Sequence, residues 1–198
     1  MLHTTIFIGR SGSGKGTQAG LLKDWISESD PERRQILYVE TGDHYRKFVG
    51  STTFSAKLAN TLYDKDELAP DFIGCWLWGD VLINELEENM HLVFDGASRT
   101  LLEAQVLSSA LKFYKREKPT VIYINVSNRW SDDRLLARGR TDDKSLERIN
   151  KRLKWFDEEV MPAIKYFKSN KMYRFIEVNG EKSVEKVHSE IISAYDSA

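Results

Sequence analysis

A glycine-rich loop near the amino terminus is the feature that most constrains how this chain can fold. Residues 9–17 read Gly-Arg-Ser-Gly-Ser-Gly-Lys-Gly-Thr and stand between a short apolar run and a segment with helical periodicity. In a strand, loop and helix of this kind, glycines let successive backbone N–H groups turn inward, and the helix N-terminus adds partial positive charge. Lys15 can then reach the β- and γ-phosphates of a nucleotide. The loop therefore predicts a phosphate-binding site, and a merely flexible turn is the alternative.

Five short apolar runs rich in β-branched residues predict the strands of a sheet. They are residues 4–8, 36–39, 91–94, 121–126 and 173–178. A helical pattern follows each run, and this alternation is typical of a parallel sheet whose two faces are both covered by helices. The predicted fold class is therefore α/β, with a doubly wound, parallel, five-stranded sheet of the P-loop NTPase type.

The segment between the second and third predicted strands is too long for a simple crossover. Residues 41–89 read as three helical stretches that are broken near Gly50 and at Pro70. We expect a small helical excursion over the carboxyl edge of the sheet, where ligands of open α/β sheets bind. The chain then forms a single domain. We predict a core of residues 1–40, 90–138 and 144–198, an insertion over 41–89 and a very short loop over 139–143.

Charge and cysteine content argue against several classes of function. The 29 lysine and arginine residues nearly balance the 30 aspartate and glutamate residues, so we expect no nucleic-acid partner. The single cysteine, Cys75, cannot form an internal disulfide, and this favours a reducing, cytoplasmic location. The apolar run before Gly9 is too short for a signal peptide, and no run approaches the roughly 20 apolar residues of a membrane span. We also expect a monomer without a membrane partner.

The end of the loop, Gly14-Lys15-Gly16-Thr17-Gln18, resembles the corresponding loop of adenylate kinases and related nucleoside monophosphate kinases. The resemblance extends nearly to the end of the chain. It implies phosphoryl transfer from ATP–Mg²⁺ to a nucleoside monophosphate, with a helical monophosphate-binding insertion and a lid. Thr17 would supply the hydroxyl near Mg²⁺, because Gly16 stands where the strict P-loop pattern has serine or threonine. The ATP-binding residues implied in the loop are Gly12, Ser13, Gly14, Lys15, Gly16 and Thr17.

Two further segments resemble the acceptor site of this family. Residues 41–43, Thr-Gly-Asp, and the following Arg46 match the opening of the insertion, where Thr41 would face the base and Arg46 would bind the phosphate,. Residues 94–100, Phe-Asp-Gly-Ala-Ser-Arg-Thr, are similar to the family's aspartate-glycine-phenylalanine-proline-arginine signature. The resemblance implies that Asp95 orients Mg²⁺ largely through water. Its other implied acceptor residues are Glu67, Leu68, Ala69, Gly96, which allows close approach, and Arg99, which holds the phosphate.

Two departures from the family pattern bear on the acceptor. Ala97 and Ser98 replace phenylalanine and proline, so we expect this loop to be less rigid,. Glu103 stands where adenylate kinases carry a glutamine that reads adenine. A carboxylate only accepts hydrogen bonds, so it would suit the two donors of guanine better, whereas Thr41 matches the adenine-reading form of its motif. AMP is the expected acceptor, and GMP or a pyrimidine nucleotide is the alternative.

An arginine-rich stretch follows the fourth predicted strand. Arg134 and Arg138 are four residues apart, as are Arg148 and Arg152, so each pair projects from one helical face,. Convergent arginines are what phosphoryl transfer asks of a protein. The family's residues at Arg134, Arg138, Arg140 and Arg152 contact donor and acceptor phosphates, whereas Arg148 is expected to be a solvated surface residue. The catalytic candidates are Lys15, Arg99, Arg138, Arg140 and Arg152.

The lid, residues 139–143, is shorter than the family's compact form, so we expect it to shield the site incompletely and to allow some ATP hydrolysis without acceptor. Lys182 lies in a segment that resembles the family's donor-adenine contact, although Gly180 fits a left-handed turn equally well,. A nucleotide-binding regulatory protein that has lost turnover is the rival from another class, and the retained lysine and arginines argue against it. Packing roles are expected for Trp76, Trp78, Trp130 and Trp155.

Overall fold

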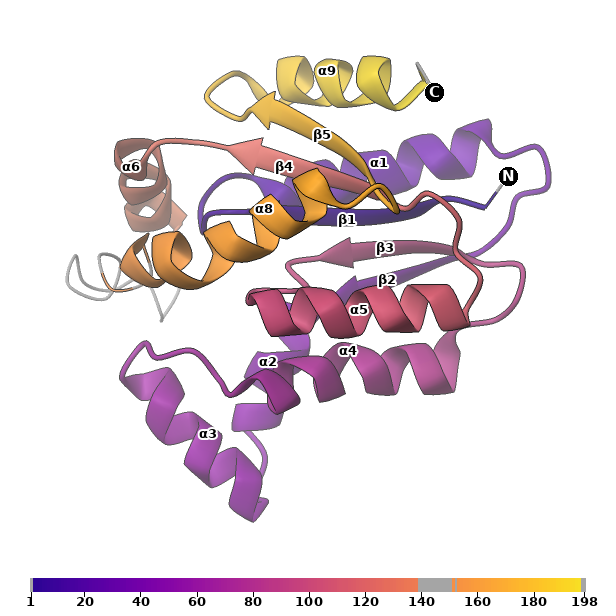
Figure 1. The fold of residues 1–198 in the computed structure, drawn as a ribbon. Helices are drawn as coiled ribbons and strands as arrows, with labels where there is room; N and C mark the ends of the chain where they lie inside the picture. The colour runs from indigo at the N-terminus through magenta and orange to yellow at the C-terminus, as the bar shows by residue number, and fades with distance from the viewer. Residues whose placement is uncertain (1, 139–150, 152, 197–198) are drawn as a thin grey trace.

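A fully parallel, five-stranded sheet in the order β2-β3-β1-β4-β5 lies at the centre of the fold (Figure 1). The computed structural model describes residues 2–138, 151 and 153–196. The predicted doubly wound α/β fold is confirmed, and each predicted strand overlaps an observed one. The strands are β1 (Thr4–Gly9), β2 (Ile36–Glu40), β3 (His91–Asp95), β4 (Thr120–Asn125) and β5 (Arg174–Asn179).

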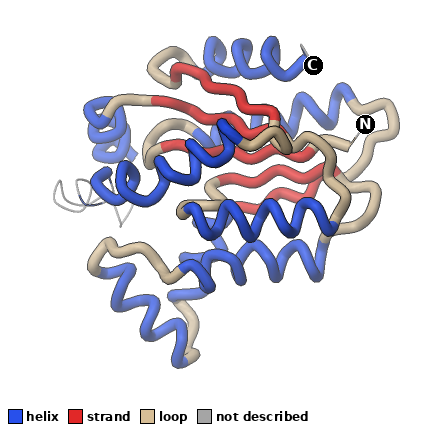
Figure 2. Tube along the Cα trace, in the orientation of Figure 1, coloured by secondary structure: helices blue, strands red, loops and turns tan. Residues whose placement is uncertain are grey.

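Helices cover both faces of the sheet, as the blue segments around the red strands of Figure 2 show. Phe7 of β1 shares one buried cluster with Leu22 and Ile191, whereas its neighbour Ile6 shares the other cluster with Leu107 and Phe167. Alternate side chains of a strand point to opposite faces, so burial on both faces makes the strands almost continuously apolar. The first face is covered by α1 (Lys15–Ser29) and α9 (Val184–Asp196), and the second by α5 (Leu101–Phe113) and α8 (Met161–Ser169).

The long insertion forms three helices, as the sequence predicts. They are α2 (Thr41–Val49), α3 (Phe54–Asp64) and α4 (Asp71–Glu85). The backbone N–H of Gly50 still bonds to Arg46 at the end of α2, and Pro70 immediately precedes α4, since proline starts helices far more readily than it continues them. Tyr45, Ala59 and their neighbours build a small core within the insertion. In Figure 1, α3 stands away from the sheet and α4 runs alongside α5.

Further helical segments lie between β4 and α8. After β4, the chain forms α6 (Asn128–Arg138), and a π-helical turn, η2 (Phe156–Val160), leads directly into α8. The predicted lid, residues 139–143, lies outside the described residues. None of the helices in the described part of the chain is long and apolar enough to cross a membrane.

The last residues of the strands meet at one edge of the sheet. Gly9 ends β1, Glu40 ends β2 and Asp95 ends β3. Glu40 and Asp95 are register partners on neighbouring strands. Loops leaving the carboxyl ends of parallel strands share one edge, which is where open α/β sheets bind their ligands. The predicted phosphate loop, insertion and acceptor loop all begin here.

Candidate active site

A cleft of about 810 Å³ opens at this edge. The phosphate loop, the insertion, the loop after β3, α6 and η2 all contribute to its lining. The cleft therefore brings together segments that the sequence analysis treated one by one. The predicted site residues that line it are Gly12, Gly14, Lys15, Gly16, Thr17, Arg46, Glu67, Leu68, Ala69, Asp95, Gly96, Arg99 and Arg134.

The phosphate loop ends in a left-handed glycine. Gly14 has φ +90° and directly precedes the first residue of α1, and this backbone conformation favours glycine because it has no Cβ. The Nζ of Lys15 donates to the carbonyl oxygens of Gly9 and Arg10, each at 2.8 Å. The lysine thus folds back over its own loop, beside the N-terminus of a helix whose first N–H groups have no helical partner. This arrangement is suited to an anion.

Asp95, at the end of β3, is hydrogen-bonded by Tyr38 and lies close to Gly16. The hydroxyl of Tyr38 donates to its Oδ2 at 3.1 Å. A Cβ at Gly16 would lie 3.0 Å from the same oxygen, so a larger residue at this position would press on the carboxylate. This contact accounts for the glycine that separates Lys15 from Thr17. Burial, and then the charge of Asp95, raise the pKa of Tyr38, which keeps the phenol protonated as a donor.

The oxygen atoms of this corner fit a hard divalent cation. Thr17 offers a hydroxyl and Asp95 a carboxylate, and both line the cleft. Mg²⁺ prefers oxygen ligands and usually keeps several waters while binding one or two carboxylates and the substrate phosphates. The two residues therefore suit the ion that the fold implies.

Two arginines from separate segments approach the same glycine. A Cβ at Gly42 would lie 3.4 Å from Nη1 of Arg46 and 3.8 Å from Nη2 of Arg99. Arg46 also pairs with Glu40, with 3.1 Å between Nη2 and Oε1. Arg46 lies 3.5 Å from Oδ1 of Asp43 as well, so carboxylates offset part of the charge at this corner. Two guanidinium groups so close together still provide forked donors, which is the geometry that phosphate oxygens require.

The arginine-rich stretch is described only in part. Arg134 lies over the ring of Trp130, with 4.9 Å from its guanidinium carbon to the ring centroid. Its Nη1 is 3.7 Å from the position that a Cβ at Gly14 would take. Arg134 therefore adds positive charge beside the phosphate loop. Arg138 ends α6, but its side chain and the residues Arg140, Arg148 and Arg152 lie outside the described part of the structure.

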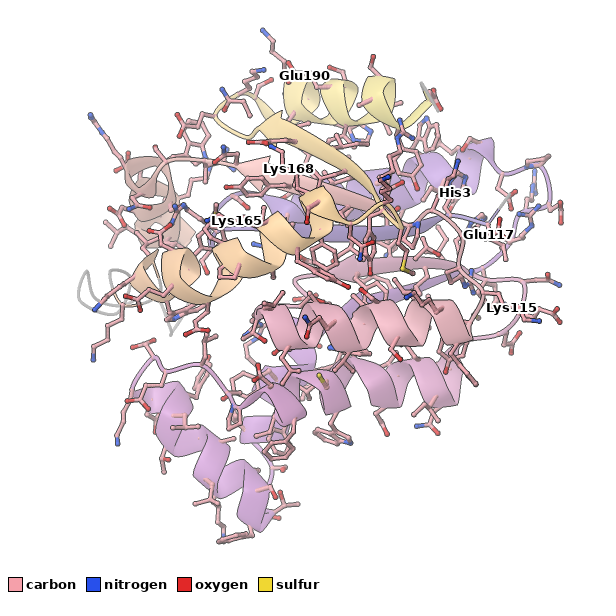
Figure 3. The ribbon with its side chains drawn as sticks, viewed as in Figure 1. His3, Lys115, Glu117, Lys165, Lys168 and Glu190 are labelled. Atoms are coloured by element: carbon pink, nitrogen blue, oxygen red, sulfur yellow. The ribbon has the colours of Figure 1, made fainter. Side chains whose placement is uncertain are left out.

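Among the predicted site residues whose side chains the structure describes, four do not line the cleft. Ser13 and Thr41 are buried. Glu103 is also buried, and its Oε2 accepts from the backbone N–H of Arg99 at 2.7 Å. Lys182 donates to both carboxylate oxygens of Glu190, each at 2.7 Å; Figure 3 labels this glutamate on α9.

Gly180 does not belong to the described glycines that have a positive φ. It therefore lacks the left-handed conformation that the sequence suggested as an alternative. It is needed for space. A Cβ at this position would lie 2.6 Å from Cγ2 of Ile124 and 2.7 Å from Cγ1 of Val126.

Several residues in the cleft or beside it were not predicted from the sequence. Trp155 was expected only to pack, but it lines the cleft together with Phe156. Arg10 lies 4.3 Å from the centroid of Phe156 and pairs with Asp157 at 2.6 Å, so the phosphate loop is tied to η2. The position of Arg10 within the loop was a usable signal, whereas nothing in the sequence pattern marked Trp155.

Comparison with known proteins agrees with this geometry. The family described as adenylate kinase matches residues 7–172. The chain belongs to the adenylate kinase family. The adenylate kinase of Flavobacterium psychrophilum is 32% identical over 194 residues, which cover 94% of each chain. Those of Azobacteroides pseudotrichonymphae and Leptospira biflexa are 30% and 31% identical, covering 99% and 96% of this chain and 98% and 97% of their own.

Membership of the adenylate kinase family confirms the predicted resemblance and the phosphotransferase class.

Proposed function

We propose that the protein transfers the terminal phosphoryl group of ATP–Mg²⁺ to a nucleoside monophosphate, with AMP as the acceptor and two molecules of ADP as the products. One observation carries this proposal. The guanidinium groups of Arg46 and Arg99 converge beside Gly42 in the same cleft that Lys15 and the phosphate loop line. A cleft with a phosphate loop and a separate pair of arginines has binding groups for two sets of phosphates.

Each part of the cleft then has a role in the transfer. The loop amides and Lys15 hold the donor phosphates, while Arg46 and Arg99 hold the acceptor phosphate so that its oxygen faces the donor in line. Thr17 and Asp95 would hold Mg²⁺, largely through water, and the ion would supply positive charge to the donor phosphates. No general base is needed, because the acceptor phosphate is already ionised. Catalysis is thus positioning and preorganised positive charge.

The placement of Glu103 bears on the choice of acceptor base. GMP would require a carboxylate that is free to meet the two donors of guanine. One oxygen of this carboxylate already accepts from the Arg99 N–H, and the side chain does not line the cleft. The case for guanine is therefore weakened, and AMP remains the proposed acceptor.

An acceptor panel tests the proposal. The protein is mixed with ATP, Mg²⁺ and one of AMP, GMP, CMP or UMP, and ADP formation is followed. We expect AMP to give the highest kcat/KM. A clear preference for another base would overturn the choice of acceptor, and the absence of ADP formation with every acceptor would overturn the kinase activity itself.

The same assay without acceptor tests the prediction from the short lid, which is slow ADP formation from ATP and Mg²⁺ alone. Strictly acceptor-dependent turnover would contradict it. We further propose that the protein works as a monomer in the reducing cytoplasm, where Cys75 stays a thiol. Burial raises the pKa of this cysteine to about 11, so its reactive thiolate form is scarce at neutral pH.

A further inference from the structure

The carboxylate of Glu103 is hydrogen-bonded to the backbone of the protein itself. Glu103 lies in the first turn of α5, and its N–H donates to Oγ1 of Thr100, the N-cap, at 3.2 Å. Its own Oε2 accepts from the N–H of Arg99 at 2.7 Å. This exchange is a variant of the capping box, in which the N-cap hydroxyl and the glutamate three residues later satisfy each other's backbone donors. Here the carboxylate reaches one residue further back, to Arg99.

The carboxylate also rests in a socket on α4. A Cβ at Gly74 would lie 2.7 Å from the carboxyl carbon of Glu103, so any residue larger than glycine would displace the side chain. Only 4% of Glu103 is exposed, and burial raises the pKa of its carboxyl. A buried carboxylate is costly unless it is hydrogen-bonded. The bond to Arg99 therefore stabilises the group in this place.

The loop that this bond restrains has an unusual backbone. Ser98, immediately before Arg99, has φ +63° and is fully buried. A non-glycine residue in the left-handed region persists only where its surroundings fix it. Two hydrogen bonds fix the backbone here. Glu103 accepts from the Arg99 N–H, and the Thr100 hydroxyl donates to Oδ1 of Asp71 on α4 at 2.5 Å.

We infer that Glu103 is a positioning residue for Arg99, and that it does not read the acceptor base. By fixing the Arg99 backbone against α4, it sets where the guanidinium stands beside Gly42 and hence where the acceptor phosphate binds. This inference rests on the proposed function. Oε2 could reach a base only by leaving the Arg99 N–H unpaired, and breaking one side of such a bond costs more than the bond itself contributes,. The other oxygen, Oε1, lies against Gly74 of α4, and the side chain does not line the cleft.

Substitution of Glu103 tests the inference. Glu103→Ala removes the acceptor of the Arg99 N–H, so we expect the KM for AMP to rise roughly tenfold, with the KM for ATP nearly unchanged. Glu103→Gln keeps an oxygen that can accept the same bond, so we expect the KM for AMP to stay within about threefold of the wild-type value. The ratio of kcat/KM for AMP to that for GMP should be the same in all three proteins.

Asp30 offers a matched control. Its Oδ2 also accepts a backbone N–H from an arginine four residues later, Arg34, at 2.7 Å, and it is also buried. It lies beside His91, at the amino end of β3 and so at the opposite edge of the sheet. Asp30→Ala should lower stability while leaving the KM for AMP unchanged, which separates loss of a buried carboxylate from loss of this particular one.

The socket offers a second, independent test. Gly74→Ala should displace the carboxylate and raise the KM for AMP as Glu103→Ala does. When Gly74→Ala is combined with Glu103→Ala, it should raise the KM for AMP little further, because no carboxylate remains to be displaced. Gly79→Ala is the matched control, since it lies on the same helix and its Cβ would meet nothing within 4 Å.

The outcomes distinguish the inference from the proposed function. If the wild type is active but Glu103→Gln shifts the AMP to GMP ratio by about tenfold or more, Glu103 reads the base and the inference is wrong. An unchanged KM for AMP in both Glu103→Ala and Gly74→Ala would also overturn it. If the wild type binds AMP without turnover, the Kd for AMP measured by calorimetry replaces KM. If Glu103→Ala does not fold, the base ratio of Glu103→Gln still decides.

Discussion

Arg46 and Arg99 place their guanidinium groups within 4 Å of the position that a Cβ at Gly42 would take, although α3, α4 and β3 separate them in the chain. Arg46 is on α2, directly after β2, and Arg99 follows β3. Because β2 and β3 are neighbours in the sheet, their carboxyl ends bring the two side chains to one place. The order of the strands therefore explains why the two arginines lie close together.

Removing either arginine should weaken acceptor binding. We expect Arg46→Ala and Arg99→Ala each to raise the KM for AMP by about 10- to 100-fold, the scale of a lost hydrogen-bonded charge, with little change in the KM for ATP. Lysine should not restore either site, because it lacks the planar fork. Arg129→Ala, an exposed residue of α6, is the control. A rise confined to the KM for ATP would contradict this assignment.

Lys15 should act on the rate of transfer. We expect Lys15→Met to lower kcat roughly 100- to 1,000-fold, the effect of removing one preorganised donor from developing charge. Steady-state kinetics at saturating ATP and AMP provide the measurement. A melting temperature close to that of the wild type would show that the loop still folds without the bonds to Gly9 and Arg10. A kcat near the wild-type value would remove Lys15 from the catalytic set.

Tyr38 should influence the requirement for Mg²⁺. Tyr38→Phe removes the hydroxyl that donates to Asp95 at 3.1 Å, and partners of this kind orient metal-binding carboxylates, with typical losses of about tenfold or more in metal affinity. We expect half-maximal activity to need about tenfold more Mg²⁺. Tyr114→Phe, which removes a hydroxyl bonded to Leu82 instead, is the control. An unchanged Mg²⁺ titration would argue against a role for Tyr38 at the metal.

Ser98 should tolerate glycine and reject proline. Its φ of +63° is open to glycine but closed to proline, whose ring fixes φ near about −65°,. We expect Ser98→Gly to be neutral or to stabilise by about 1 kcal/mol, and Ser98→Pro to raise the KM for AMP and lower the melting temperature. Full activity of the proline variant would show that the loop follows another path. The family's proline at this position thus implies a different local backbone.

Acid should destabilise the end of the sheet that lies opposite the cleft, where β1 and β3 begin. The backbone N–H of His3 donates to Nδ1 of His91 at 2.9 Å, and Nε2 of His91 lies 3.3 Å from Oδ2 of Asp30. Figure 3 places His3 near the amino terminus, at the end of the sheet where β1 begins. Burial lowers the pKa of both histidines in the folded protein. The unfolded chain therefore takes up protons at higher pH than the folded protein does.

The two neutral histidines contribute fully to the stability of the folded protein above about pH 6.5, the ordinary pKa of imidazole. This contribution is lost as the pH falls below that value. Thermal unfolding measured from pH 8 to pH 5 should show a falling melting temperature. His91→Leu should flatten this dependence while lowering the melting temperature at pH 8, because the His3 N–H loses its acceptor. His44→Gln, on α2, should leave the slope unchanged. A flat profile in the wild type would contradict the prediction.

The sequence by itself determined the elements and the phosphate loop. Strand periodicity, the glycines of residues 9–17 and the breaks near Gly50 and at Pro70 act over a few residues, so they can be recognised without knowing the neighbours in space. The pattern Thr100-x-x-Glu103 was also a local signal, since it is the signature of a capping box. It would have pointed to a structural role for Glu103.

Only the tertiary structure decided which side chains meet. The order β2-β3-β1 sets Glu40 beside Asp95 and brings Arg46 to Arg99, and Gly74 on α4 makes room for a carboxylate from α5. The direction of a side chain depends on the space and the partners that distant segments provide, and a residue's type does not record them. For this reason, the chemistry of the phosphate loop could be derived from the chain, whereas the place of Glu103 could not.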